Sequence, residues 1–311
     1  MGNQNYAPEG ARLEDKQNKS LTGSLTGLRT ARDTGTIVEG VAVSCDQEHN
    51  LIVELGEGYG VIPRTECAIG IESGETRDIA ILSRVGKPVC FVVTDINGEH
   101  ISLSRRLAQE RALAWLLANL RPGDVIPACV THLEPFGAFV DVGCGVVSFI
   151  GIENISVSRI FHPRERFSCG QMIRAAVLGT DPAARRIHLT HRELLGTWAQ
   201  NAALFHAGET VRGIVRSLEP YGIFIELAPN LSGLAERRAG LREGDHVSVY
   251  IKSILPERMK VKLNVIDTLR RPCGPPPAPR YFIPDGHIDQ WIYTPPCCKS
   301  KYIATDFVTP P

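Results

Sequence analysis

The chain has 311 residues, of which 43% are hydrophobic and 22% are charged, so it can bury a core and is not disordered as a whole. Thirty-four basic and 34 acidic residues give a formal net charge of zero, which excludes a uniformly basic, histone-like binder. No apolar run approaches the roughly 18 residues that a membrane span needs, and residues 1–20 lack the apolar stretch of a secretory signal.

The nine cysteines form an odd set without a CxxC pair, which favours reduced thiols in a cytoplasmic protein over a disulfide framework. Charge is distributed unevenly, since residues 35–120 carry a net charge of −5 and residues 208–272 a net charge of +3. This asymmetry predicts different partners for different parts of the chain, although chance could also produce it.

Three repeats follow a polar, aperiodic segment, residues 1–34, that we expect to be disordered. They begin with the similar pairs Gly35-Thr36, Gly123-Asp124 and Gly208-Glu209, at intervals of 88 and 85 residues. After each pair comes a run in which apolar residues alternate with polar ones, the pattern typical of strands.

The second and third repeats align without a gap, so that LEPFGAF at 133–139 matches LEPYGIF at 218–224. The first repeat has His49 and Ile52 where the others have aromatic residues. Five short strands in about 70 residues, with glycine at sharp bends, predict a small closed barrel in each repeat. In the second repeat we expect strands near 124–133, 137–142, 146–152, 172–179 and 186–191.

Two segments between the repeats, 104–120 and 191–207, have helical patterns, and each contains a tryptophan, Trp115 or Trp198. We expect each helix to pack its tryptophan against a neighbouring barrel. The last segment is rich in proline and then in aromatic residues, and we expect it to dock on a barrel or on a partner because it cannot fold alone.

We therefore predict a mainly β chain of three tandem five-stranded barrels, joined by short helical linkers and flanked by flexible termini. The expected boundaries are a disordered tail at 1–34, a degenerate acidic barrel at 35–104, a helical linker at 105–121, a second barrel at 122–192, a second linker at 193–207, a third barrel at 208–269 and a C-terminal tail at 270–311.

This pattern resembles the S-one RNA-binding domain, a five-stranded barrel of the OB-fold class that is repeated in the largest small-subunit ribosomal protein. The resemblance rests on the glycine-acidic start, the aromatic-Gly-x-Phe motif and a late strand ending in Leu-Ser or Leu-Thr. That strand is ISLSR at 101–105 and IHLTH at 187–191, with VKLN at 261–264 in the third repeat. The resemblance covers about residues 35–267.

The resemblance implies RNA binding on one face of the barrel, where flat aromatic rings stack against unpaired bases. Phe136 and Phe139 match the family's stacking positions in the second repeat, and Tyr221 and Phe224 match them in the third. The alternative is that Phe139 and Phe224 fill the barrel interior.

The third strand departs from the family, which usually carries a histidine in a Gly-Leu-Val-His stretch. The third repeat has Glu236 at that position, where an acid would repel phosphate, and the first repeat has Pro63. In the second repeat Phe149 is a candidate substitute for the histidine.

Basic residues near the turn before the last strand match the family's pattern better. Asp181 with Arg185 or Arg186 fits it in the second repeat. In the third repeat Arg258, Lys260 and Lys262 alternate, so we expect them on one strand face, either as a phosphate track or as an ordinary solvated face. Further candidates for such a track are Arg159, Arg164, Arg166, His188 and His191.

We expect a protein that binds single-stranded RNA or mRNA in translation and acts by binding, with no cofactor, no catalytic activity and no membrane partner. The resemblance makes the acidic first repeat a candidate for contact with proteins of the small ribosomal subunit. A protein-interaction scaffold with weak or no RNA binding is the alternative. Cys273, His287, Cys297 and Cys298 are zinc-ligand types, but their spacing matches no known tight site.

Overall fold

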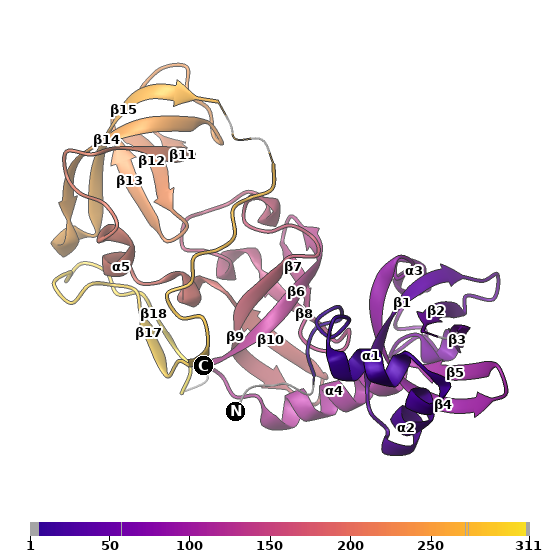
Figure 1. Ribbon diagram of the computed structural model, residues 1–311. Coiled ribbons are helices and arrows are strands. Elements are labelled where there is room, and N and C mark those ends of the chain that lie inside the picture. Colours follow the sequence, from indigo (N-terminus) through magenta and orange to yellow (C-terminus); the bar gives the residue numbers. More distant parts are fainter. Residues whose placement is uncertain (1–5, 57, 271, 273, 309–311) are drawn as a thin grey trace.

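A computed structural model describes residues 6–56, 58–270, 272 and 274–308. These residues form three closed five-stranded barrels, which confirms the predicted fold class (Figure 1). No helix within the described ranges is both long and apolar enough to cross a membrane.

Barrel one has the strand order β1-β2-β3-β5-β4, in which only β3 and β5 pair in parallel. Alternate residues point inward, and Val53, Phe91 and Leu103 are fully buried in its core. A short helix, α3 (Ile79–Leu82), lies in the connection from β3 to β4. The strands are β1 (Val38–Cys45), β2 (Leu51–Leu55), β3 (Gly58–Ile62), β4 (Lys87–Asn97) and β5 (His100–Ser104).

Barrels two and three repeat this topology with the same parallel pairing of their third and fifth strands. In barrel two the first and fourth strands, β6 and β9, close the barrel. Its strands are β6 (Asp124–Glu134), β7 (Gly137–Asp141), β8 (Val147–Gly151), β9 (Met172–Asp181) and β10 (Arg186–Thr190). Those of barrel three are β11 (Thr210–Glu219), β12 (Gly222–Ala228), β13 (Leu231–Ala235), β14 (His246–Leu255) and β15 (Lys260–Leu269).

The two linkers between the barrels contain α-helices of different lengths. Between barrels one and two runs α4 (Arg105–Asn119), capped by the Ser104 side chain, which accepts a hydrogen bond from Leu107 N. Between barrels two and three only α5 (Trp198–Ala202) is α-helical, because Gly196 before it adopts φ 84° and interrupts the helix. Trp198 is buried in the core of barrel three, whereas Trp115 is half-buried and contacts Tyr6, with ring centroids 5.7 Å apart.

The expectation that residues 1–34 are disordered is wrong for the described residues 6–34. They contain α1 (Lys16–Thr22) and α2 (Leu25–Thr34), whose N-caps are Asp15 and Ser24. Leu28 and Ala31 of α2 are fully buried in the core of barrel one. The polar composition gave no sign of these helices, because α2 needs only two apolar side chains to pack against a barrel formed elsewhere in the chain.

The N-terminal segment also joins barrels one and two. Glu9 is buried and receives two hydrogen bonds from Arg105, at 2.6 and 2.9 Å, while its backbone N–H donates to Asp141 of β7 at 2.7 Å. Burial alone would raise the pKa of Glu9, but the charges of Arg105 and Arg84 hold this pKa below its usual value.

The C-terminal tail is ordered as well, so the expectation of a flexible terminus is wrong for residues 274–308. It packs along barrels two and three, drawn in yellow in Figure 1. Its aromatic residues Trp291, Tyr293 and Phe307 are buried in the same cluster as the core of barrel three. The tail contains β16 (Gly286–His287), which adds to β6, and the pair β17 (Gln290–Ile292) and β18 (Ala304–Asp306).

Candidate nucleic-acid interface

One transverse row of side chains crosses four neighbouring strands of barrel two. Phe139 of β7 lies opposite His132 of β6 and Phe149 of β8. Phe149 in turn pairs with His188 of β10. We call these four residues the barrel-two row.

The row lies on the outer face of the barrel. Ala138 and Ile150, which flank row residues in sequence, are fully buried, and successive residues of a strand point to opposite faces. Phe139 and Phe149 are therefore only half-buried, and the structure does not place Phe139 inside the barrel. The interior-filling alternative is wrong for this residue.

Phe136 extends the row into an aromatic cluster. It occupies the turn between β6 and β7 and is 58% exposed. Its ring centroid lies 6.2 Å from that of Phe139 and 5.7 Å from that of Phe149, and the last two centroids are 5.2 Å apart. Such tilted and edge-on contacts hold the rings in place while leaving aromatic surface open to stack on bases.

Gly137 allows this cluster to form. A Cβ at this position would lie 2.3 Å from the Phe149 ring and 2.4 Å from the Ile150 carbonyl oxygen. The glycine of the Phe-Gly-x-Phe motif is thus required because the third-strand phenylalanine packs across its backbone.

Barrel three has a related row with less aromatic surface. The register places Ser217, Phe224, Leu234 and Lys262 across β11, β12, β13 and β15. Phe224 is half-buried and faces outward, since Ile223 and Ile225 fill the interior, so it too does not plug its barrel. Leu234 stands where barrel two has Phe149.

Tyr221 is the most exposed aromatic residue of this site. It is 70% exposed in the turn between β11 and β12, and its ring meets that of Phe224 edge-on at 6.2 Å. Tyr221 therefore corresponds in place to Phe136, and barrel three offers two stacking rings rather than three.

The equivalent row of barrel one is Ser44, Ile52, Val61 and Ser102, with no aromatic side chain. His49, in the turn, is held by Asp78, whose Oδ2 lies 3.0 Å from the His49 Nδ1. The row of barrel one therefore provides no ring for stacking.

Basic residues line the last hairpin of barrels two and three. Arg186 and His188 are exposed on alternate positions of β10, and Lys260 and Lys262 are exposed at the equivalent positions of β15. Each pair lies on the same face as its aromatic row, because His188 and Lys262 belong to the rows themselves. Both hairpins thus place positive or protonatable groups beside the rings.

Of these hairpin residues Arg258 lies elsewhere than expected, whereas Asp181 lies at the turn before the last strand, as expected. Arg258 lies in a 3₁₀ turn, η5 (Pro256–Arg258), before β15, so it does not alternate with the lysines on one strand. Asp181 ends β9, where its carboxylate accepts a hydrogen bond from Ala184 N at 2.9 Å and stabilises the turn. The turn continues at the exposed Arg185, which has φ 53°.

Of the additional candidates, Arg159 and Arg164 are exposed in the connection from β8 to β9. Arg166 does not lie on an exposed phosphate track beside the row, because it is buried in an ion pair with Glu226 of β12 at 2.6 Å. His191 is also buried, with Nδ1 2.8 Å from the Ile155 carbonyl, and burial lowers its pKa to about 4.

Glu236 follows β13 and lies outside the barrel-three row, where Leu234 stands instead. Its side chain is 87% exposed and pairs with Lys252 at 3.5 Å. The acid therefore points into solvent beside a lysine.

Sequence reasoning missed His132, whose ring centroid lies 6.2 Å from that of Phe139. The sequence contained a signal for this pairing. A two-residue turn at Pro135-Phe136 pairs Glu134 with Gly137, and the residues two positions further along each strand, His132 and Phe139, then lie opposite each other. His132 Nε2 also lies 2.6 Å from Glu134 Oε1.

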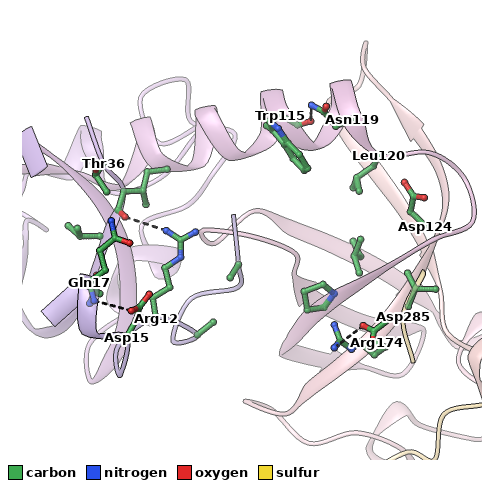
Figure 2. Close-up of a pocket in the computed structure, with 18 of the residues that line it drawn as sticks. Arg12, Asp15, Gln17, Thr36, Trp115, Asn119, Leu120, Asp124, Arg174 and Asp285 are labelled. Atoms are coloured by element: carbon green, nitrogen blue, oxygen red, sulfur yellow. Dashed lines mark hydrogen bonds and ion pairs between the residues drawn. The ribbon is translucent and has the colours of Figure 1, made fainter. Parts of the chain in front are cut away.

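A cavity of about 1210 Å³ lies elsewhere, between the N-terminal segment and barrel two, and Figure 2 shows it below Trp115 and Leu120. Arg12 and Asp15 lie on one side, and Asp124, Arg174 and Asp285 on the other (Figure 2). Arg174 pairs with Asp285 at 3.0 Å. With three acids against two arginines, this cavity offers no surplus of positive charge for a phosphate backbone.

Metal ligands do not gather in the part of the chain that the structure describes, where no group of three or more histidine, cysteine or acidic side chains could hold an ion. Cys273 lies outside the described residues.

Residues 119–192 match the family model of the S1 RNA binding domain. The chain is 28% identical over 278 residues to small ribosomal subunit protein bS1 of Staphylococcus aureus (strain COL), covering 84% of this chain and 69% of the relative. It is 24% identical over 262 residues to bS1 of Rhizobium meliloti (strain 1021), covering 79% of this chain and 45% of the relative.

Among solved structures, a multidomain protein with nucleic acid binding domains from Streptococcus pneumoniae TIGR4 covers 75% of this chain and 73% of its own at 14% identity. The TM-score is 0.25, which is too low to support an argument about function.

Proposed function

Because the chain carries an S1 RNA binding domain and resembles small ribosomal subunit protein bS1 over most of its length, we propose that it binds single-stranded RNA, including mRNA, in association with the small ribosomal subunit. The observation that carries this proposal is the outward-facing aromatic row of barrel two. A protein core explains buried rings, but it does not explain three phenylalanines gathered on an outer face with Phe136 58% exposed.

The rings bind by stacking, which tolerates any base because every base has a flat face. Phe136, Phe139 and Phe149 of barrel two form one platform, and Tyr221 and Phe224 of barrel three form another. The mechanism is binding rather than catalysis, and sequence preference is weak.

Phosphate contacts supply the second part of the affinity. Arg185 and Arg186 of barrel two are exposed in the last hairpin, as are Arg258, Lys260 and Lys262 of barrel three. Charges at this edge lie within reach of the phosphates of a strand whose bases stack on the rows.

Barrel one has a separate role in this proposal. It lacks the aromatic row, and residues 35–120 carry a net charge of −5, which opposes phosphate binding. We assign it to contact with basic proteins of the small ribosomal subunit, which also implies a cytoplasmic protein. A scaffold of the same fold that does not bind RNA is the alternative, favoured by the missing platform of this barrel.

A titration of the full chain with a fluorescent single-stranded RNA of about thirty nucleotides, at low and moderate salt, tests the proposal. Tight binding that weakens steeply with salt is expected. No binding at low salt would contradict the proposal and favour the scaffold.

The double variant Lys260→Ala/Lys262→Ala tests the phosphate contacts in the same assay. It should reduce the slope of log affinity against log salt by about 1.4, since each phosphate contact to single-stranded nucleic acid contributes about 0.7. The matched control Lys299→Ala/Lys301→Ala removes two exposed lysines of the tail and should leave the slope unchanged.

A further inference from the structure

A cluster of four arginines and two glutamates lies where barrel two, barrel three and the tail meet. Glu226 Oε2 accepts hydrogen bonds from Arg166 Nη2 and Arg216 Nε, both at 2.6 Å. Arg216 also donates to Glu165. Arg212 and Arg280 line the adjoining cavity, so four guanidinium groups and two carboxylates leave a formal charge of +2.

The centre of this cluster is buried, since Arg166, Arg216 and Glu226 are 8%, 3% and 5% exposed. Among the described residues no acceptor lies within hydrogen-bond distance of Arg166 Nε or Arg216 Nη2, although both atoms are buried. A buried donor without a partner destabilises the fold, and a charged one does so more strongly. The cluster thus has two more positive charges and two more donors than its own acceptors satisfy.

Glu226 compensates the buried charge of Arg166 only in part. Burial and the neighbouring Arg216 lower its pKa below the usual value, even though Glu226 opposes the change. An additional negative charge beside Arg166 would relieve this cost.

A cavity of about 380 Å³ adjoins the cluster and provides room for such a charge. Arg166, Arg212 and Arg280 line it on the polar side, and Leu195, Ile214 and Leu227 are among its apolar residues. A proline-rich strap, residues 276–280, borders it, and proline limits the conformations of such a segment. The strap positions Arg280, whose guanidinium lies 5.5 Å from the centre of the Phe282 ring.

We propose that this cavity binds a phosphate monoester, with Arg166, Arg212 and Arg280 contacting the phosphate and the apolar wall contacting the attached group. Guanidinium groups bind phosphate oxygens through paired hydrogen bonds. A phosphate monoester carries about −1.5 to −2 charges at neutral pH, which matches the surplus of the cluster, whereas each internal phosphate of RNA carries only one.

This site is separate from the aromatic rows. It lies at the end of the β11–β12 hairpin that contains Gly213 and Ala228, whereas Tyr221 lies in the turn at the opposite end. The proposal therefore goes beyond the proposed function and does not depend on it.

Calorimetric titration of the full chain with adenosine 5′-monophosphate tests the site, with adenosine as the ligand that lacks the phosphate. Saturable binding of the monophosphate and none of adenosine is expected. In the variant Arg212→Ala/Arg280→Ala, which removes two exposed arginines and leaves the buried pairs intact, affinity should fall at least ten-fold.

The matched control is Arg237→Ala/Arg242→Ala, which removes two exposed arginines of barrel three outside the cavity. It should leave the affinity for the monophosphate unchanged. Equal losses in the two double variants, or no binding of either the monophosphate or inorganic phosphate to the wild-type chain, would overturn the proposal.

Two RNA oligonucleotides of one sequence, with and without a 5′-phosphate, distinguish the sources of the monoester. A gain in affinity from the 5′-phosphate that disappears in Arg212→Ala/Arg280→Ala identifies an RNA end as the ligand. Binding of the monophosphate without such a gain identifies a free small phosphate ester. The variant Phe136→Ala/Phe139→Ala should keep its affinity for the monophosphate, so a failure of RNA binding at the rows can be told apart from a failure of this site.

Discussion

Gly137 shows at the scale of one residue how the motif and the site are connected. A methyl group there would collide with both the Phe149 ring and the Ile150 carbonyl, so the strand or the ring must move. The same position in barrel three, Gly222, adopts φ 157° and would place a Cβ 2.7 Å from the Ala235 carbonyl oxygen.

The variant Gly137→Ala should lower the free energy of unfolding by about 1–3 kcal/mol, as overpacking generally does, and should weaken RNA binding by displacing Phe149. Gly179→Ala is the matched control in the same barrel, because a Cβ there meets no atom within 4 Å. Chemical denaturation measures the free energy of unfolding of both variants. Equal stabilities of the two variants would contradict the packing argument.

Tyr221 and Tyr302 test stacking with side chains of equal type and similar exposure, 70% and 72%. Tyr221→Ala should weaken RNA binding by about 5- to 150-fold, the equivalent of losing the 1–3 kcal/mol of one stacked base. Tyr302→Ala, in the tail, should bind as the wild type does. The comparison is made by fluorescence anisotropy, and a similar effect of both substitutions would exclude Tyr221 as a specific stacking residue.

His191 makes the stability of the chain depend on pH. Its pKa is about 4 in the folded chain and about 6.5 when unfolded, so the unfolded chain binds the proton first as pH falls. This group therefore contributes stability above pH 6.5 that is lost between pH 6.5 and 4, up to about 3 kcal/mol.

The non-titrating variant His191→Asn should lose less stability than the wild type over this pH range, as measured by denaturation at each pH. The difference between the two pH profiles isolates His191 from other groups that titrate there. Parallel profiles would show that His191 is not the buried neutral histidine described above.

At the scale of elements, the contact between barrels two and three depends on Glu226 of β12. It is the carboxylate shared by Arg166, next to η3 (Pro163–Glu165), and by Arg216 of β11. Because η3 belongs to barrel two, whereas β11 and β12 belong to barrel three, the ion pairs fix the two barrels against each other.

Replacement of this carboxylate, Glu226→Gln, should destabilise the chain by about 3–5 kcal/mol, because it leaves two buried guanidinium groups without their shared anion. The control Glu236→Gln changes an acid of the same barrel that is 87% exposed and should have little effect. Thermal unfolding measures both variants, and an equally small effect of Glu226→Gln would show that the ion pairs do not hold this junction.

For the whole molecule, the repeats, the barrels and the exposed aromatic residues could be predicted from the sequence, because strand alternation and the Phe-Gly-x-Phe motif are local signals. The docking of both ends could not. Leu28 and Trp291 are buried only because barrels formed elsewhere in the chain provide surfaces for them. Arg166 looked like an RNA ligand because nothing near it in sequence reveals its partner Glu226, 60 residues away.

The three barrels thus share one topology and differ in their outer rows. The row of barrel two has two phenylalanines and two histidines, that of barrel three has one phenylalanine and one lysine, and that of barrel one has no ring. The ordered ends bind the barrels together, since Glu9 contacts both barrel one and barrel two and the tail contacts barrels two and three. We expect RNA binding to reside in barrels two and three of a single connected body.

The most direct test of this claim is an anisotropy titration of a fluorescent single-stranded RNA of about thirty nucleotides with the wild-type chain and with the variant Phe136→Ala/Phe139→Ala/Tyr221→Ala/Phe224→Ala. A folded quadruple variant should bind this RNA at least 100-fold more weakly, since four stacking rings are lost. An affinity within about two-fold of the wild type, in a variant whose circular dichroism matches that of the wild type, would contradict it.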